Sequence, residues 1–221
     1  MEIHRSICCK ELMKLNVMGS KGKKIGHIND FTFTFNGSLK LSQFILGGGI
    51  WEEILESLKL RPDKDPIFNA SLIKRIGDQI QLDTDVESLK TTLDECAISD
   101  DEIRLSELSK LDIFDENGVK IGNVIDVDFD VDGKASLIVG GSFVEEKLES
   151  LGIKPDIDII VPDDVIESIS DKIQLMVTKD ELESTLEDVL HERNPAVQKV
   201  KDERMVLQDG AKVRLWSQRP Y

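Results

Sequence analysis

This 221-residue chain contains three aspartates at alternate positions that could together bind a cation. The order Asp128-x-Asp130-x-Asp132-Gly133 begins like a calcium-binding EF-hand loop, in which alternate oxygen-bearing side chains hold the cation. Such a loop needs a bidentate Glu at its last position, and this chain has Val139 there. The pattern therefore favours a β-hairpin with acidic outward residues. Weak binding of a divalent ion to this row of aspartates stays open.

Other residues capable of chemistry lack the spacing that chemistry requires. The glycines Gly47-Gly48-Gly49 precede an expected helix but no Lys-Ser/Thr follows, so a tight turn is favoured over a phosphate loop. The conceivable zinc ligands contain no C-x-x-C pair, which favours structural roles for all of them: His4, Cys8, Cys9, His27 and Cys96. We find no Ser/His/Asp or Cys/His set, and we therefore expect a chain that is not an enzyme and uses no cofactor and no metal.

The overall composition narrows the class of partner. The formal charge is −15, which disfavours general nucleic-acid binding, and the aromatic content of 5% argues against base-stacking platforms. The beginning of the chain lacks the apolar core of a signal peptide, and the longest apolar stretch is too short to span a bilayer. Together with the 3 cysteines, which fit a reducing compartment, these features predict a cytoplasmic protein.

The acidity belongs to one segment of the chain. Residues 1–98 hold 13 basic and 14 acidic side chains, residues 99–187 hold 8 and 24, and residues 188–221 hold 7 and 5. The net charges are therefore −1, −16 and +2. These limits coincide with the domains that we predict: a first barrel over 1–98, an acidic second barrel over 99–187 and a basic tail over 188–221.

An internal repeat supports this division. The residues of the two copies match in the same order along roughly eighty positions, which favours two copies of one small domain. We call residues 1–98 the first repeat and residues 99–187 the second repeat. The matched positions include Gly22 with Gly118, Gly26 with Gly122, Asp30 with Asp126, Pro62 with Pro155, Asp78 with Asp171, and Leu82 with Leu175.

The second repeat shows how one copy is built. Residues 111–132 predict two strands joined by a turn at Glu116-Asn117-Gly118, with a further turn at Asp132-Gly133. Alternation predicts that Val119, Ile121, Ile125, Val127, Phe129 and Val131 face inward and that Asp126, Asp128, Asp130 and Asp132 face outward as a solvated row. In the first repeat, Thr32 and Thr34 are expected to face outward. A helix is expected over 143–151, and a closing hairpin turns at Ser170-Asp171.

Short strands with tight turns favour a small closed barrel, and here the residues resemble a known family. The order G-x-x-I-G-x-V/I-x-D, followed by I-x-x-I-G/S-D-x-I-x-L, resembles the PRC-barrel family. Its positions in this chain include Gly22, Gly26, Asp30, Gly77, Asp78, Gly118, Gly122, Asp126 and Asp171. Ser170 departs from Gly77 of the first repeat. We therefore expect a mainly β fold with short helices: two tandem PRC-type β-barrels followed by a C-terminal helix and a hairpin tail.

The tail has no counterpart after the first repeat. Thr178-Lys179-Asp180-Glu181 predicts a capping box and a helix, and residues 204–216 predict a hairpin with a turn at Asp209-Gly210. The basic tail could dock on the acidic barrel of its own chain or of a neighbouring one. Aromatic and apolar anchors are enriched at protein interfaces, so the candidate interface residues are Trp51, Phe143, Asp128, Asp130, Leu215, Trp216 and Tyr221.

The resemblance implies action through protein–protein contact. We expect an adaptor or scaffold, similar to archaeal PRC-barrel proteins that include CdpB-type cell-division adaptors, with SepF or other division proteins as partners and recruitment to the division site. Homo-oligomers through a barrel or the tail are also open. The alternative is a ribosome-maturation factor similar to RimM, acting through a ribosomal protein, although RimM-like proteins place an unrelated barrel beside their PRC barrel. A small-ligand or metal-regulated enzyme has the least support.

Overall fold

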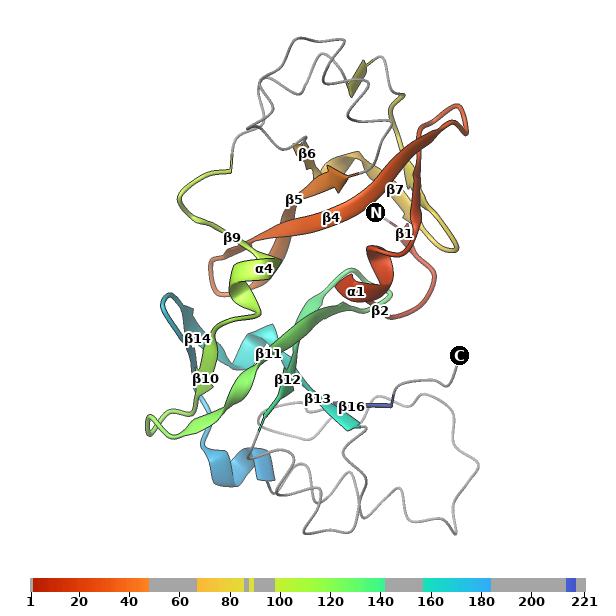
Figure 1. The fold of residues 1–221 in the computed structure, drawn as a ribbon. Coiled ribbons are helices and arrows are strands. Elements are labelled where there is room, and N and C mark those ends of the chain that lie inside the picture. The colour runs from red at the N-terminus through yellow and green to blue at the C-terminus, as the bar shows by residue number, and fades with distance from the viewer. Residues whose placement is uncertain are drawn as a thin grey trace, which may run out of the picture. The chain divides into compact units, whose positions relative to one another are not determined.

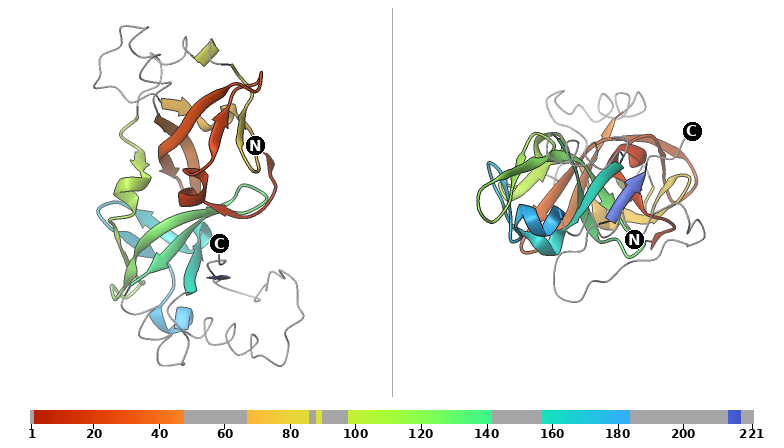
Figure 2. Two further views of the ribbon diagram at one scale, coloured as in Figure 1. Left: turned by 45° about the vertical axis from the view of Figure 1, so that its right-hand side comes forward. Right: turned by 90° about the horizontal axis from the view of Figure 1, so that it is seen from below.

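The structure is a computed structural model that describes residues 2–47, 67–85, 88–89, 98–141, 157–183 and 214–217. It divides into two compact units, one formed by residues 1–108 with 127–135 and the other by residues 109–126 with 136–221. The described elements are mainly β-strands with a few short helices, and the sheets curl rather than lie flat (Figures 1 and 2). This confirms the predicted fold class. The helix expected over 143–151 lies outside the described residues.

The first sheet is formed by strands of the first repeat and by β9 of the second repeat. Its order is β1-β7-β8-β3-β4-β5-β6, and β9 joins β4 off this path. The strands are β1 (Glu2–Ile3), β3 (Asn16–Met18), β4 (Lys24–Phe35), β5 (Leu39–Gly47), β6 (Ile67–Asn69), β7 (Ile73–Ile76), β8 (Ile80–Leu82) and β9 (Glu102–Arg104). A 3-10 turn, η1 (Ala70–Leu72), links β6 to β7.

The second sheet has the order β14-β15-β10-β11-β12-β13-β16, and β2 joins β11 off this path. The strands are β2 (Ile7–Cys8), β10 (Asp112–Phe114), β11 (Lys120–Phe129), β12 (Ala135–Gly140), β13 (Ile157–Pro162), β14 (Ile166–Ile169), β15 (Ile173–Leu175) and β16 (Arg214–Ser217). The short helices are α1 (Cys9–Leu12), α4 (Leu105–Leu108) and the 3-10 turn η2 (Asp163–Val165).

Six strands have the same order in the two sheets, β7-β8-β3-β4-β5-β6 in the first and β14-β15-β10-β11-β12-β13 in the second, and their central pairs share a register. Val17 pairs with Gly26 and, on its other side, with Ile80, while Ile113 pairs with Gly122 and with Ile173. The irregularities recur as well, since the β7–β8 and β14–β15 pairs each shift register at the same aligned place. A shared register is a demanding match, because a slip of one residue would turn every side chain to the opposite face.

The turns follow the sequence prediction. Gly22 and Gly118 have φ of 74° and 76°, a left-handed conformation that glycine adopts without steric cost. In the second turn the amide of Gly118 donates to the carbonyl of Asp115 at 3.0 Å. In the following hairpin the amide of Gly133 donates to the carbonyl of Asp130 at 2.9 Å. The predicted glycine turns are therefore confirmed.

The predicted solvated row of aspartates is wrong at its first two members. Asp126 and Asp128 are 2% and 1% exposed, Asp130 is half-buried and Asp132 is exposed. For Asp128 the reason lies in β2, which pairs with β11 at Asp128 and Phe129. Thr32, expected to face outward, is likewise buried where β9 pairs with β4. At the ends of the expected inward row, Val119 and Val131 are exposed because both lie outside β11.

The tail matches the prediction in part. The capping box forms, because the amide of Glu181 donates to Thr178 Oγ1 at 3.1 Å and the amide of Thr178 donates to Glu181 Oε2 at 2.8 Å. The described helix that follows covers residues 179–183. The expected first strand of the tail hairpin lies outside the described residues. The described segment β16 pairs antiparallel with β13 of its own chain, with Leu215 opposite Ile159.

We predict that replacing Gly122 by Ala destabilises the fold. A Cβ at Gly122 would overlap the carbonyl oxygen of Gly140, which is backbone and cannot move alone. Overpacking of this kind costs about 1–3 kcal/mol, measurable by urea unfolding. Gly77→Ala is the matched control, since its nearest neighbour would be His4 Nδ1 at 3.6 Å, and its change should stay within about 0.5 kcal/mol. Equal losses in the two variants would contradict this packing argument.

A second prediction concerns β16. Removing residues 188–221 should expose the outer edge of β13, because β16 supplies the antiparallel partner of Ile157–Ile160. Amide hydrogen exchange of these residues should therefore accelerate, while exchange in β15 stays as it was. Light scattering of the full and shortened chains at several salt concentrations separates docking within one chain from docking between chains. Unchanged exchange in β13 would show that β16 does not protect this edge in solution.

Candidate protein-binding surface

The signature aspartates are divided between packing and turns. Asp30 is buried, whereas Asp78 and Asp171 lie in exposed turns. Asp30 Oδ2 accepts from Ser106 Oγ at 2.7 Å, and Asp30 Oδ1 accepts from the amides of Phe31 and Ser106 at 2.8 and 3.3 Å. Ser106 belongs to α4, so the carboxylate sits at the beginning of that short helix, where amide donors need acceptors. Asp30 is therefore a structural cap that holds the start of the second repeat.

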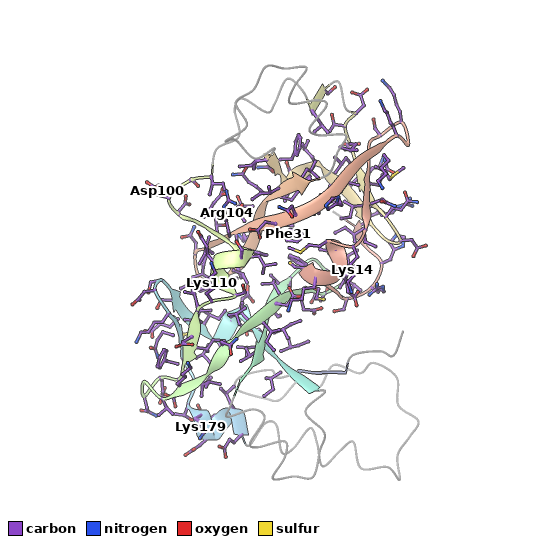
Figure 3. All side chains as sticks on the ribbon, viewed as in Figure 1. Lys14, Phe31, Asp100, Arg104, Lys110 and Lys179 are labelled. Atoms are coloured by element: carbon purple, nitrogen blue, oxygen red, sulfur yellow. The ribbon has the colours of Figure 1, made fainter. Side chains whose placement is uncertain are left out.

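The lead-in of each repeat, which contains β2 in the first repeat and β9 in the second, is held by a further carboxylate, buried at Asp128 and half-buried at Glu102. Ser6 Oγ donates to both oxygens of Asp128, at 2.9 and 2.8 Å. On the other lead-in, Glu102 Oε1 accepts from Ser42 Oγ at 2.7 Å, and Glu102 Oε2 accepts from Gln43 Nε2 at 2.9 Å. Figure 3 labels Arg104 and Phe31 on the two segments that meet there, β9 and β4. Asp128 is thus used inside the fold, and its side chain is not presented to a partner.

The aspartates of the candidate ion-binding row make hydrogen bonds to different parts of the chain. Asp130 Oδ1 accepts from the amides of Asp132 and Lys134, each at 2.9 Å, which is the hydrogen bonding of an Asx turn. Asp128 is engaged by Ser6 instead. Within the described ranges no group of three or more His, Cys, Asp or Glu side chains is arranged to hold a metal ion. Of the conceivable zinc ligands, Cys8 and Cys9 are buried, and Cys96 lies outside the described residues.

Asp115 is a buried acidic residue that the sequence prediction did not single out. It is 1% exposed. Its Oδ1 accepts from the amides of Asn117 and Val119 at 2.9 and 2.7 Å, and its Oδ2 accepts from the amide of Lys179 at 2.9 Å. Figure 3 labels Lys179 at the beginning of the helix at 179–183. The residue aligned with Asp115 is Gly19, so this anchor for the C-terminal helix belongs to the second repeat.

Exposed apolar side chains mark one end of the second sheet. Val119 and Met176 are 45% and 52% exposed, and both lie beside the turn that Asp115 organises. The amide of Val119 donates to Asp115, and the amide of Glu116 donates to the carbonyl of Val177, next to Met176, at 3.1 Å. The aligned residues of the first repeat are Lys23 and Asp83, which are polar and exposed. We call Val119 and Met176 the apolar pair.

The structure describes only some of the remaining candidate interface residues. Trp51, Phe143 and Tyr221 lie outside the described residues. Leu215 and Trp216 are described by their backbone in β16, where Trp216 stands opposite Asp158. The sequence prediction missed the apolar pair because single exposed valines and methionines are common. The signal that could have found the pair is its contrast with Lys23 and Asp83.

A hollow in the first unit is lined mainly by polar residues. This hollow of about 370 Å³ lies at the β1–β7 end, and its lining residues include Glu2, Lys74, Arg75 and Asp83. At a neighbouring position, Lys21 Nζ donates to Asp85 Oδ2, and this hydrogen bond lowers the pKa of Asp85 to about 2. This ion pair is an exposed contact, and contacts of this kind contribute little to stability.

We predict that Asp115→Asn loosens the C-terminal helix. An amide in place of the carboxylate turns one acceptor into a donor, which leaves an amide hydrogen without an acceptor at about 1–3 kcal/mol. Urea unfolding should show this loss, and amide exchange should accelerate at Lys179. Asp112→Asn is the control, since its 2.7 Å ion pair with Lys120 is about half exposed and such pairs contribute at most about 1 kcal/mol. A helix as protected in the variant as in the parent chain would contradict the anchoring role.

No described helix has the length and apolarity needed to cross a membrane. No curated protein matches the chain in a sequence search. A family model does match: residues 100–182 correspond to the PRC-barrel domain. This segment contains β9, α4 and the strands from β10 to β15, so the match lies within the second repeat and includes most strands of the second sheet.

Proposed function

We propose that this chain is a non-enzymatic protein-binding adaptor built on two PRC-type barrels. The observation that carries the proposal is the PRC-barrel match over residues 100–182. A PRC barrel is a small β-barrel module that acts through protein contact, and the match covers the second repeat. The first repeat, which the match does not cover, has the same strand order and the same register. We infer that duplication of one barrel produced both.

The chemistry of the buried carboxylates supports a binding function. Asp30 and Asp115 each accept three hydrogen bonds from backbone amides or a serine hydroxyl, and Asp128 accepts from the hydroxyl of Ser6. General acid–base catalysis needs a carboxyl that is poised beside a reacting group. These carboxylates are instead satisfied within the fold and join separate segments of it.

The surface that best fits a partner is the apolar pair of the second unit. Exposed apolar residues at the centre of an interface supply binding energy, and surrounding charge sets specificity and encounter rate. The second repeat holds −16 of the formal charge, so a partner with a basic rim around an apolar contact would fit it. The first repeat is near neutral and carries Lys23 and Asp83 at the aligned positions, so the two barrels present different surfaces.

The resemblance to archaeal PRC-barrel proteins suggests a specific setting, which is cell division with SepF or FtsZ as partners at the division site. The alternative setting is ribosome maturation through a ribosomal protein, as in RimM-like factors. The proposed adaptor function does not depend on which setting holds. The identity of the captured partner decides between them.

The test is site-specific photo-crosslinking in native lysate. A benzophenone amino acid at Met176 should give a discrete adduct that mass spectrometry identifies, and Val119→Lys in the same chain should reduce its yield about fivefold or more, or roughly 1 kcal/mol. The matched control carries the crosslinker at Lys23, the aligned position of the first repeat. The same adducts from Lys23, or yields that do not respond to Val119→Lys, would contradict binding at the apolar pair. A division protein or a ribosomal protein in the adduct would identify the setting.

A further inference from the structure

The two sheets differ at the edge that β7 forms in the first sheet and β14 forms in the second. In the first sheet, β1 runs parallel to β7, with Glu2 opposite Arg75 and Ile3 opposite Ile76. The amide of His4 extends this pairing by donating to the carbonyl of Ile76 at 3.3 Å. The corresponding strand of the second sheet is β14, which pairs with β15 on one side. Among the residues that the structure describes, no strand pairs with the other side of β14.

The beginning of the second repeat shows why its own lead-in does not supply this neighbour in the described part of the chain. The residues aligned with Glu2 and Ile3 are Ile98 and Ser99. They do not form a strand, and the carbonyl of Ser99 accepts from the amide of Glu102 at 3.0 Å as the chain turns toward β9. The segment that could have covered β14 is therefore used to enter β9. An edge strand with unpaired amides and carbonyls is a template on which another extended segment can be added.

The charge along this edge is opposite to that of β7. Both strands shift register at the same aligned place, which is how a bulge brings two successive residues to one side. In β7 these residues are Lys74 and Arg75, which line one hollow together with Glu2. In β14 the aligned residues are Glu167 and Ser168, and both are exposed. The outer edge of β7 therefore carries two cationic side chains near Glu2, whereas the outer edge of β14 carries one carboxylate, that of Glu167.

We propose that the outer edge of β14 binds an extended segment of a partner protein, parallel to β14, with a basic residue at the place that Glu2 holds on β7. The inference deepens the adaptor function proposed above and rests on it. Backbone hydrogen bonds such as that from His4 to Ile76 give the segment its register, and Glu167 selects its charge. Opposite charges on adjacent strands are favourable and like charges are not.

A second copy of this chain fits the edge poorly. Two copies of β14 paired about a two-fold axis would bring Glu167 of one chain near Glu167 of the other. A β1 segment from another copy would bring Glu2 to the same carboxylate. Like charges that face each other across strands are destabilising, so the charge of this edge favours a basic segment from a different protein.

The experiment titrates the full, isotope-labelled chain with two synthetic peptides and follows its amide resonances. One peptide has the sequence of residues 1–6, and the other is the same peptide with Glu2→Lys. The peptide with Glu2→Lys should shift the amides of Ile166–Ile169 and bind at least about threefold more tightly than the unchanged peptide, as expected for opposite rather than like charge across strands. In the variant Glu167→Lys the order of the two affinities should reverse.

Glu116→Lys is the matched control, because it makes the same charge change at an exposed residue of the second unit that lies outside β14. It should leave the peptide preference as it is in the parent chain. Shifts confined to other residues, a preference that survives Glu167→Lys, or no shift at millimolar peptide would overturn the proposal. Crosslinking at Met176 would still succeed in that case, so failure at β14 is distinguishable from failure of the adaptor function.

Discussion

The fold depends on a few buried carboxylates that must be supplied with hydrogen-bond donors. A buried ionised group without donors is costly, so each of these side chains fixes the segment that brings its donors. Ser106 brings an amide and a hydroxyl to Asp30, and Ser6 brings a hydroxyl to Asp128. Both serines lie in the lead-ins that precede the strands of their own repeats. These hydrogen bonds hold β9 and β2 in place, and each of these strands pairs with the C-terminal part of a long strand, β4 or β11, as a further neighbour.

The same constraint explains which parts of the repeat have stayed alike. The glycine turns, the register of the central strands and the bulges recur because they determine which side chains enter the core. The polar contacts at the lead-ins have changed their direction. Ser6 of one lead-in donates to Asp128 on the long strand, whereas Glu102 of the other accepts from Gln43. A carboxylate is kept at each junction, buried at Asp128 and half-buried at Glu102, and it lies on the long strand in one case and on the lead-in in the other.

The sequence pattern correctly predicted features that depend only on residues close together in the chain. The positive φ values at Gly22 and Gly118 and the capping box at Thr178 depend on neighbouring residues, and the sequence identified all three. Alternation also assigned Asp126 and Asp128 to one face of β11. It could not say that a further strand would pair with β11 at Asp128, because β2 comes from more than a hundred residues earlier in the chain. The inference from a charged row to a solvated face failed at Asp128 for that reason.

The residues of the candidate surface were harder to predict from the sequence than the turns and the helix cap. Asp115 was indistinguishable from the surrounding acidic residues until its three amide donors were seen, and two of those donors lie within its own turn. The apolar pair consists of residue types that are usually buried, and only the comparison with Lys23 and Asp83 makes its exposure informative. Comparison between repeats is therefore the stronger guide, since a shared backbone isolates what the side chains have changed.

The differences between the two copies fall at positions that the fold leaves open. Charge accumulates in the second repeat, two exposed positions become apolar there, and its lead-in leaves the β14 edge to enter β9. None of these changes disturbs the register of the central strands, which both sheets keep. Backbone groups along an edge can bind many extended segments, so discrimination among partners must come from side chains beside it. In the second repeat the exposed carboxylate of Glu167 lies beside this edge. On the first repeat Lys74 and Arg75 stand at the aligned positions, so the same backbone can carry the opposite charge.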